Sequence, residues 1–154
     1  MLFRRLLIIL TVFLTATFAQ RREIDPEIKG YKLTMPKIRA YDVVVHKLYA
    51  ATKADPALKT SFKTAGTKKT LNDMVAAVES NPKMLTVIQS SGLNAREFCV
   101  LPMGIMSAGT AYMIQTQYKK DASNTANADN IAFYGANRDE IEKLTKTWTA
   151  SDDQ

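Results

Sequence analysis

The chain has one cysteine, Cys99, and one histidine, His46, among its 154 residues. A lone cysteine cannot form a disulfide within the chain, and a lone histidine excludes His-rich zinc sites and the paired histidines of a metalloprotease helix. No metal site is therefore predicted. Cys99 is expected to be a small buried hydrophobe on a helix, with a reactive thiol or an intermolecular bridge as the alternative.

Motifs that commit a protein to one chemistry are also missing. The sequence has no Cys-x-x-Cys-His haem-attachment site, no glycine-rich phosphate loop and no Gly-x-Ser-x-Gly nucleophile elbow. We therefore expect no cofactor, and the sequence favours a non-enzymatic role.

The first 19 residues have the pattern of a secretory signal peptide. Residues 1–5 are positively charged, residues 6–14 are apolar except for one threonine, and Thr17 and Ala19 occupy the minus-three and minus-one positions of a cleavage site. We expect cleavage after Ala19 and a periplasmic or secreted protein. The alternative is a retained membrane anchor, although residues 6–19 would span only about 21 Å as a helix, against about 30 Å of hydrocarbon.

The rest of the chain divides into three parts. Residues 20–34 are polar and charged without a hydrophobic period, which predicts an extended polar arm. Residues 35–149 repeat apolar side chains every three or four positions, which predicts an all-α domain: a single helical bundle of five or six helices. Residues 150–154 are predicted to form a disordered tail.

Capping residues, several of them followed by proline, mark where the helices of this domain should begin. They are Thr34, Asp55, Thr70, Asn81, Asn94, and Asn127 or Asp129. The longest expected helix runs from Asn94 to about Lys120 and is apolar nearly all round, which is typical of a central helix. Pro102 lies inside it and is expected to kink or break it.

Asp42 and His46 form one candidate site. They are four residues apart and therefore share one face of the first helix. A carboxylate beside an imidazole can orient it for general-base catalysis, so a hydrolase using Asp42 and His46 is an alternative function. A pair that only faces solvent is the ordinary interpretation, because both residues lie off the apolar stripe.

Met103, Met106 and Met113 form a second candidate group. Methionines at helical spacing usually fill a core, but their flexibility also suits binding surfaces, so these three are candidates for an interaction surface. A helical bundle can also hold haem b between one methionine and one histidine. Because His46 with Met103 or Met106 could supply that pair, a bundle that binds a small ligand or haem b is a further alternative.

Three segments resemble small secreted helical proteins of unknown function found in bacteria. They are residues 91–98 (SGLNAREF), 127–134 (NADNIAFY) and 140–142 (EIE). The resemblance implies a bacterial, exported, helical domain. It assigns no site residue, because none of these segments is a functional motif.

The formal net charge is +6 at pH 7. An exported protein is not expected to meet nucleic acid, so the positive charge fits weak contact with an anionic membrane surface or an acidic envelope partner. Together with the absent catalytic motifs, these observations favour a protein-binding role. The function that the sequence favours is that of an accessory subunit of a bacterial envelope or membrane complex.

Overall fold

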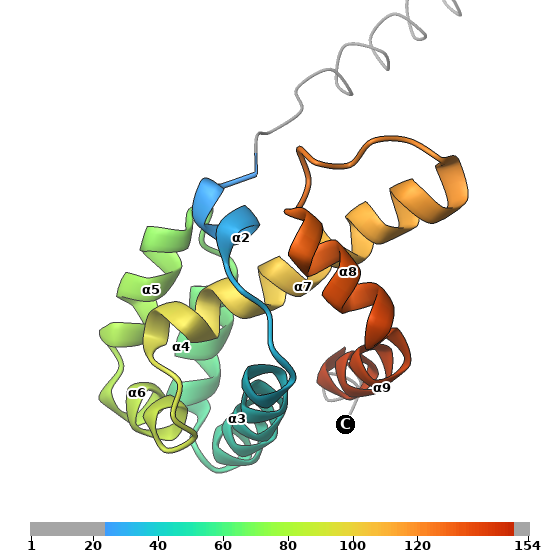
Figure 1. Ribbon diagram of the computed structural model, residues 1–154. Coiled ribbons are helices and arrows are strands. Elements are labelled where there is room, and N and C mark those ends of the chain that lie inside the picture. The colour runs from blue at the N-terminus through green and yellow to red at the C-terminus, as the bar shows by residue number, and fades with distance from the viewer. Residues whose placement is uncertain (1–23, 150–154) are drawn as a thin grey trace, which may run out of the picture.

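The computed structural model describes residues 24–149, and over this range every regular element is an α-helix (Figure 1). In chain order the elements are α2 (Pro26–Gly30), α3 (Met35–Ala54), α4 (Pro56–Gly66), α5 (Leu71–Glu79), α6 (Pro82–Gln89), α7 (Ala95–Tyr118), α8 (Ala128–Ala136) and α9 (Arg138–Thr149). The all-α prediction is confirmed. The predicted signal peptide and the predicted tail lie outside the described residues.

The described part has eight helices, not the five or six that were predicted. One extra helix, α2, lies within the arm 20–34 that was expected to be extended. It begins where the carboxylate of Asp25 accepts a hydrogen bond from the backbone N–H of Glu27 at 2.9 Å. The other arises because the expected last helix is divided at Asn137. The Asn137 side-chain amide donates to the carbonyl of Phe133 at 2.8 Å, a local bond that competes with continuation of a helix.

The predicted helix starts were recognisable because their caps are local chemistry. Side-chain oxygens accept backbone N–H groups of the first helical turn at Asp55, Thr70, Asn81, Asn94 and Asn127. Asn94 and Glu97 complete a capping box, in which each side chain binds the other residue's backbone N–H. Thr34 precedes α3 with an extended backbone but makes no capping hydrogen bond.

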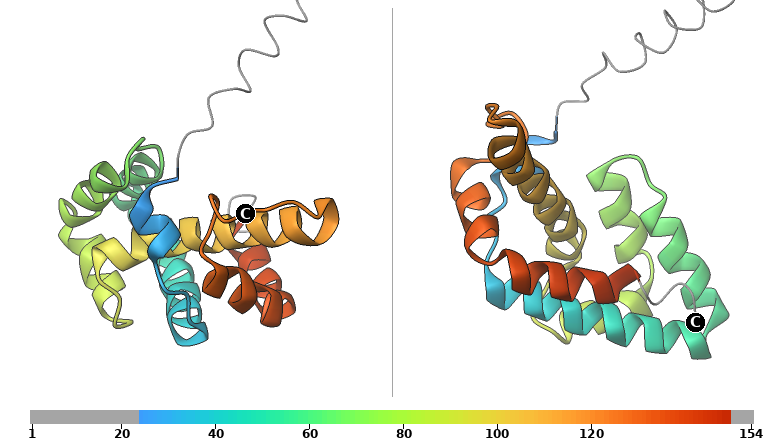
Figure 2. Two further views of the ribbon diagram at one scale, coloured as in Figure 1. Left: turned by 45° about the horizontal axis from the view of Figure 1, so that its top comes forward. Right: turned by 90° about the vertical axis from the view of Figure 1, so that its right-hand side faces the viewer.

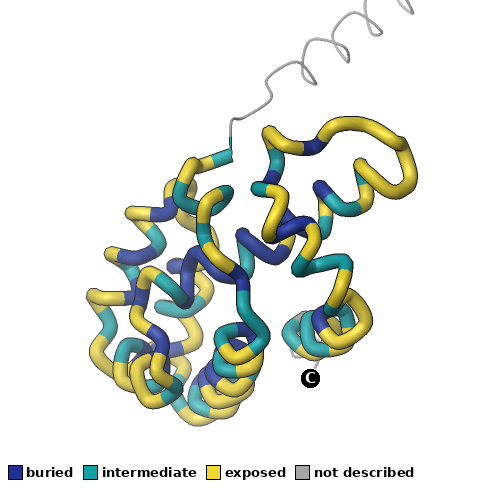
Figure 3. Tube along the Cα trace, viewed as in Figure 1, coloured by how far each residue is buried: buried dark blue, intermediate teal, exposed yellow. Residues whose placement is uncertain are grey.

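Helix α7 crosses the middle of the molecule (Figure 1). It contacts α2, α5 and α6 along its first half and α8 along its second half, while α9 lies along α3 (Figure 2). By length and composition α7 could cross a membrane, but half of its most apolar window is buried inside the protein. The buried residues in Figure 3 follow the inner faces of α7 and its neighbours, so this helix is the centre of the core. It continues through Pro102 without a break.

Two glycines allow α7 and α8 to come close together. A Cβ at Gly109 of α7 would lie 2.9 Å from Cζ of Tyr134, and a Cβ at Gly135 of α8 would lie 2.6 Å from Cε2 of Tyr112. Each glycine therefore receives a tyrosine ring from the other helix. The small residues of α7 are required by this packing, which offsets the lower helix propensity of glycine.

A buried asparagine of α8 forms hydrogen bonds with the backbone of the segment that precedes α3. Asn130 is 2% exposed, accepts a hydrogen bond from the N–H of Leu33 at 3.1 Å and donates to the carbonyl of Tyr31 at 2.6 Å. Leu33 is itself part of the hydrophobic core. The end of the predicted arm is therefore an ordered part of the domain.

Candidate functional site

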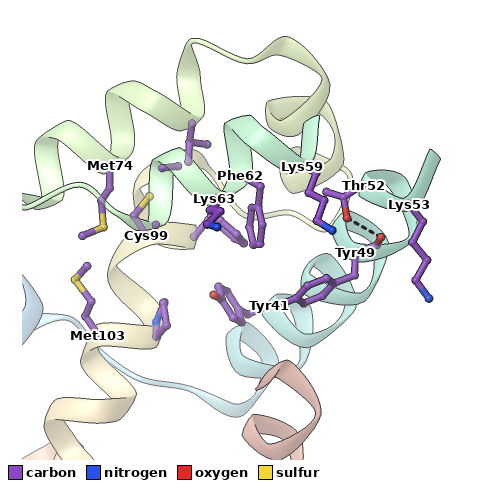
Figure 4. Close-up of a pocket in the computed structure, with 15 residues that line it drawn as sticks. Tyr41, Tyr49, Thr52, Lys53, Lys59, Phe62, Lys63, Met74, Cys99 and Met103 are labelled. Atoms are coloured by element: carbon purple, nitrogen blue, oxygen red, sulfur yellow. Dashed lines mark hydrogen bonds between the residues drawn. The ribbon is translucent and has the colours of Figure 1, made fainter. Parts of the chain in front are cut away.

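A cavity of about 730 Å³ lies between α3, α4, α5 and α7 (Figure 4). Its side chains reach it from three successive helices, α3, α4 and α5, and from α7, so it exists only after these helices have packed. Six of its fifteen lining residues are aromatic or thioether: Tyr41, Tyr49, Phe62, Phe98, Met74 and Met103. A cavity of this size and character is typical of small-molecule sites, which range from about 300 to 1,000 Å³.

Tyr41 of α3 forms one aromatic wall of the cavity. Its ring stacks on Phe98 with centroids 5.1 Å apart and meets the ring of Trp148 edge-on at 4.7 Å. The residue is 9% exposed, and its hydroxyl points into the cavity (Figure 4). Burial raises the pKa of Tyr41, so this hydroxyl stays protonated and can donate a hydrogen bond.

The other hydroxyls of the lining are already engaged. Tyr49 donates to the carbonyl of Trp148 at 3.2 Å, and Thr52 donates to the carbonyl of Tyr49 at 2.9 Å. The Tyr41 hydroxyl, by contrast, makes no hydrogen bond to any residue between 24 and 149. Among the lining hydroxyls, that of Tyr41 is therefore the one available to a ligand.

Every charged residue in the lining is a lysine. Lys53 lies in the last turn of α3, and Lys59 and Lys63 lie one turn apart on α4. Among residues 24–149, no aspartate or glutamate lines the cavity. Figure 4 shows Lys59 and Lys63 beside Phe62, whereas Lys53 extends along the outer edge. The site is therefore apolar inside and positively charged at its rim.

Cys99 also lines the cavity, from α7. It is buried, as its position on an apolar helix predicted, and burial raises the pKa of its thiol to about 11. Since the thiolate is the reactive form, Cys99 is a neutral, weakly reactive thiol at ordinary pH. It serves as part of the apolar wall.

Asp42 and His46 lie outside this cavity, where α3 meets α9. Nε2 of His46 is 3.4 Å from Oδ1 of Asp42 and 3.3 Å from the hydroxyl of Thr147. In a nucleophilic triad the acid and the nucleophile occupy different ring nitrogens, whereas here both approach the same one. The Thr147 hydroxyl also lies 2.7 Å from the carbonyl of Leu144, to which it donates. This geometry does not favour the hydrolase alternative.

The carboxylate of Asp42 has a structural role instead. Its Oδ1 accepts a hydrogen bond from Nε1 of Trp148 at 2.8 Å. This bond positions the only tryptophan of the chain against Tyr41. Asp42 therefore attaches α9 to α3 beside the cavity wall, while half of the His46 side chain remains exposed.

The three candidate methionines separate in the structure. Met103 lines the cavity, whereas Met106 and Met113 are 68% and 41% exposed on α7. His46 is not a lining residue, so the structure does not bring it to the cavity that Met103 faces. The haem pair that sequence analysis considered is therefore not assembled. Among residues 24–149 no cluster of three or more potential metal ligands occurs either.

Sequence analysis missed the cavity and most of its lining. A weak signal was present on α4, where Lys59, Phe62 and Lys63 place two lysines and an aromatic ring on neighbouring positions of one helix face. Comparison of the chain with family models, curated proteins and solved structures gave no match. The site is therefore interpreted from its own geometry.

Proposed function

We propose that this protein is a non-enzymatic binding protein that holds a small, mainly apolar molecule in the cavity between α3, α4, α5 and α7. The observation that carries the proposal is the hydroxyl of Tyr41, which points into the cavity and has no hydrogen-bond partner in the described part of the chain. A hydroxyl that borders a largely apolar cavity and is not used by the protein can donate a hydrogen bond to a polar atom of a ligand and fix its orientation.

The composition of the lining supports the same role. Aromatic rings offer large apolar contact area, and the thioethers of Met74 and Met103 can adapt to an irregular ligand. A few directed polar groups within such a lining fix the orientation of the bound molecule. This role ranks above the accessory-subunit role that the sequence favoured, because it uses side chains that four separate helices bring together.

We further propose that the binding protein works outside the cytoplasm. The signal pattern of residues 1–19 supports export. An exported carrier would be periplasmic or secreted, where small apolar molecules need a protein to cross an aqueous space.

A fluorescence titration with an uncharged, polarity-sensitive dye such as Nile red tests the binding role. The wild-type protein is expected to bind the dye saturably, with one site per chain. In the variant Gly66→Phe a ring is added at a residue that lines the cavity, where an added Cβ would meet no atom within 4 Å. We expect this variant to bind at least about tenfold more weakly, because the ring occupies ligand space.

Gly30→Phe is the matched control, since an added Cβ there also meets no atom within 4 Å and Gly30 does not line the cavity. It should bind like the wild type, and circular dichroism should show both variants folded. The proposal would be contradicted if the wild type did not bind the dye saturably, or if both variants lost dye binding to the same extent.

A protein-docking role remains a second candidate because Met106 and Met113 are exposed. They are seven residues apart on α7 and therefore share one face, which fits the envelope-partner role that the sequence favoured. The double variant Met106→Lys/Met113→Lys tests it. A partner from solubilised envelope that binds the wild type and loses affinity for this variant would support docking. A partner that binds both equally would exclude this face.

A further inference from the structure

We infer that the molecule held in the cavity is an amphipathic anion: an apolar chain that ends in one negatively charged group, such as a long-chain carboxylate. The inference rests on the proposed function and names the chemical class of its ligand. It is carried by the rim lysines Lys53, Lys59 and Lys63 together with the apolar interior behind them.

The three lysines have no acidic partner in the part of the chain that the structure describes. Among residues 24–149, none of them forms an ion pair. The acid nearest in sequence, Asp55, is already occupied: one of its carboxylate oxygens accepts from Lys83 at 2.6 Å and the other accepts the backbone N–H groups that begin α4.

Two other cations that lie where helices meet are paired with acids. Lys37 lies 2.7 Å from Glu97, and Arg96 binds Glu27. The cavity rim is different, since Lys59 and Lys63 place two like charges one turn apart, an arrangement that slightly destabilises a helix. An anionic group bound at the rim would relieve this repulsion and accept charge-assisted hydrogen bonds.

The interior behind the rim suits an apolar chain. Phe62 and Phe98 offer ring faces, and Met74 and Met103 offer flexible thioethers. The Tyr41 hydroxyl is the one donor of the interior that is not used within the described chain. A ligand with a charged head therefore has the head at the lysines, its chain against the rings, and Tyr41 within reach of any polar atom on that chain.

Displacement of the bound dye by three ten-carbon probes tests the charge of the ligand. At pH 8 the probes decanoate, decan-1-ol and decyltrimethylammonium carry a negative, a neutral and a positive head. Decanoate is expected to displace the dye at about tenfold lower concentration than decan-1-ol. This difference in affinity is what one charge-assisted hydrogen bond is expected to contribute. Added salt should reduce this preference.

The double variant Lys59→Gln/Lys63→Gln should remove the preference for decanoate and leave the displacement by decan-1-ol unchanged. Both lysines are exposed, so the substitutions should not affect folding. The matched control is Lys119→Gln/Lys120→Gln, which removes the same charge from two exposed lysines at the far end of α7 and should retain the preference.

Several results would overturn the inference and leave the proposed function standing. They are equal displacement by decanoate and decan-1-ol, stronger displacement by the cation, or loss of the preference in both double variants. The inference would also be overturned if the protein sedimented with phosphatidylglycerol vesicles through Lys59 and Lys63 while decanoate did not displace the dye. That result would assign these lysines to a membrane surface. If the dye itself does not bind, the proposed function fails first.

Discussion

Replacing Gly135 with alanine would place a methyl group 2.6 Å from Cε2 of Tyr112, at the contact between α7 and α8. Carbon atoms pack best at about 3.5–4.0 Å, so the tyrosine ring would have to move by about 1 Å. The ring is only partly buried and can swing outward. That movement would separate it from the ring of Tyr134, whose centroid lies 5.9 Å away.

The expected net effect is a destabilisation of about 1–2 kcal/mol. Overpacking of a fitted contact costs about 1–3 kcal/mol, and loss of an aromatic pair costs about 0.5–1.5 kcal/mol. In the opposite direction, alanine favours a helix over glycine by about 1 kcal/mol. The steric effect is therefore larger than the helix-propensity effect.

Urea unfolding followed by circular dichroism measures this difference as a lower midpoint with an unchanged slope. The control is Gly66→Ala, where an added Cβ meets no atom within 4 Å; it should be neutral or stabilising by up to about 1 kcal/mol. In a double-mutant cycle, Tyr112→Ala should cancel most of the cost of Gly135→Ala. A Gly135→Ala protein as stable as the wild type, or a coupling energy near zero, would refute the reasoning.

Three further predictions follow from other contacts. Asn130→Ala should lower the free energy of unfolding by about 2–4 kcal/mol in urea unfolding, because it leaves one buried and one partly buried backbone group without their partner. Burial raises the pKa of the Cys99 thiol to about 11, so stability should fall as pH rises from about 8.5, where an unfolded thiol ionises, and Cys99→Ala should remove that slope. The intact mass of the protein recovered outside the cytoplasm should correspond to a chain that begins after Ala19; the mass of the full chain would indicate a retained anchor.

The helical class and most helix starts could be predicted because they depend on local chemistry. Asp55, Asn81 and Asn94 accept hydrogen bonds from their own first turns, and those bonds need no distant partner. The same signal at Asp25-Pro26 was overlooked, since the surrounding segment lacks an apolar period. The division at Asn137 depends on a single side-chain amide, which a period of apolar residues does not reveal.

The candidate site was less predictable than the fold. His46 and Met103 were selected because their side chains can ligate a metal or a haem, but the packing of α3 against α9 directs His46 to Asp42 and Thr147 instead. Tyr41 belongs to the stripe of buried residues along α3. Nothing in the period of that stripe indicates that its hydroxyl faces a cavity.

The sequence by itself determined that this protein is helical, where most of its helices begin, and that α7 is its central helix. These properties follow from capping groups and from apolar residues spaced three or four apart, which act within one helix. Only the tertiary structure decided that α3, α4, α5 and α7 enclose a cavity with three lysines at its rim. A cavity is space left between helices, and its size and lining depend on how side chains from distant parts of the chain fit together.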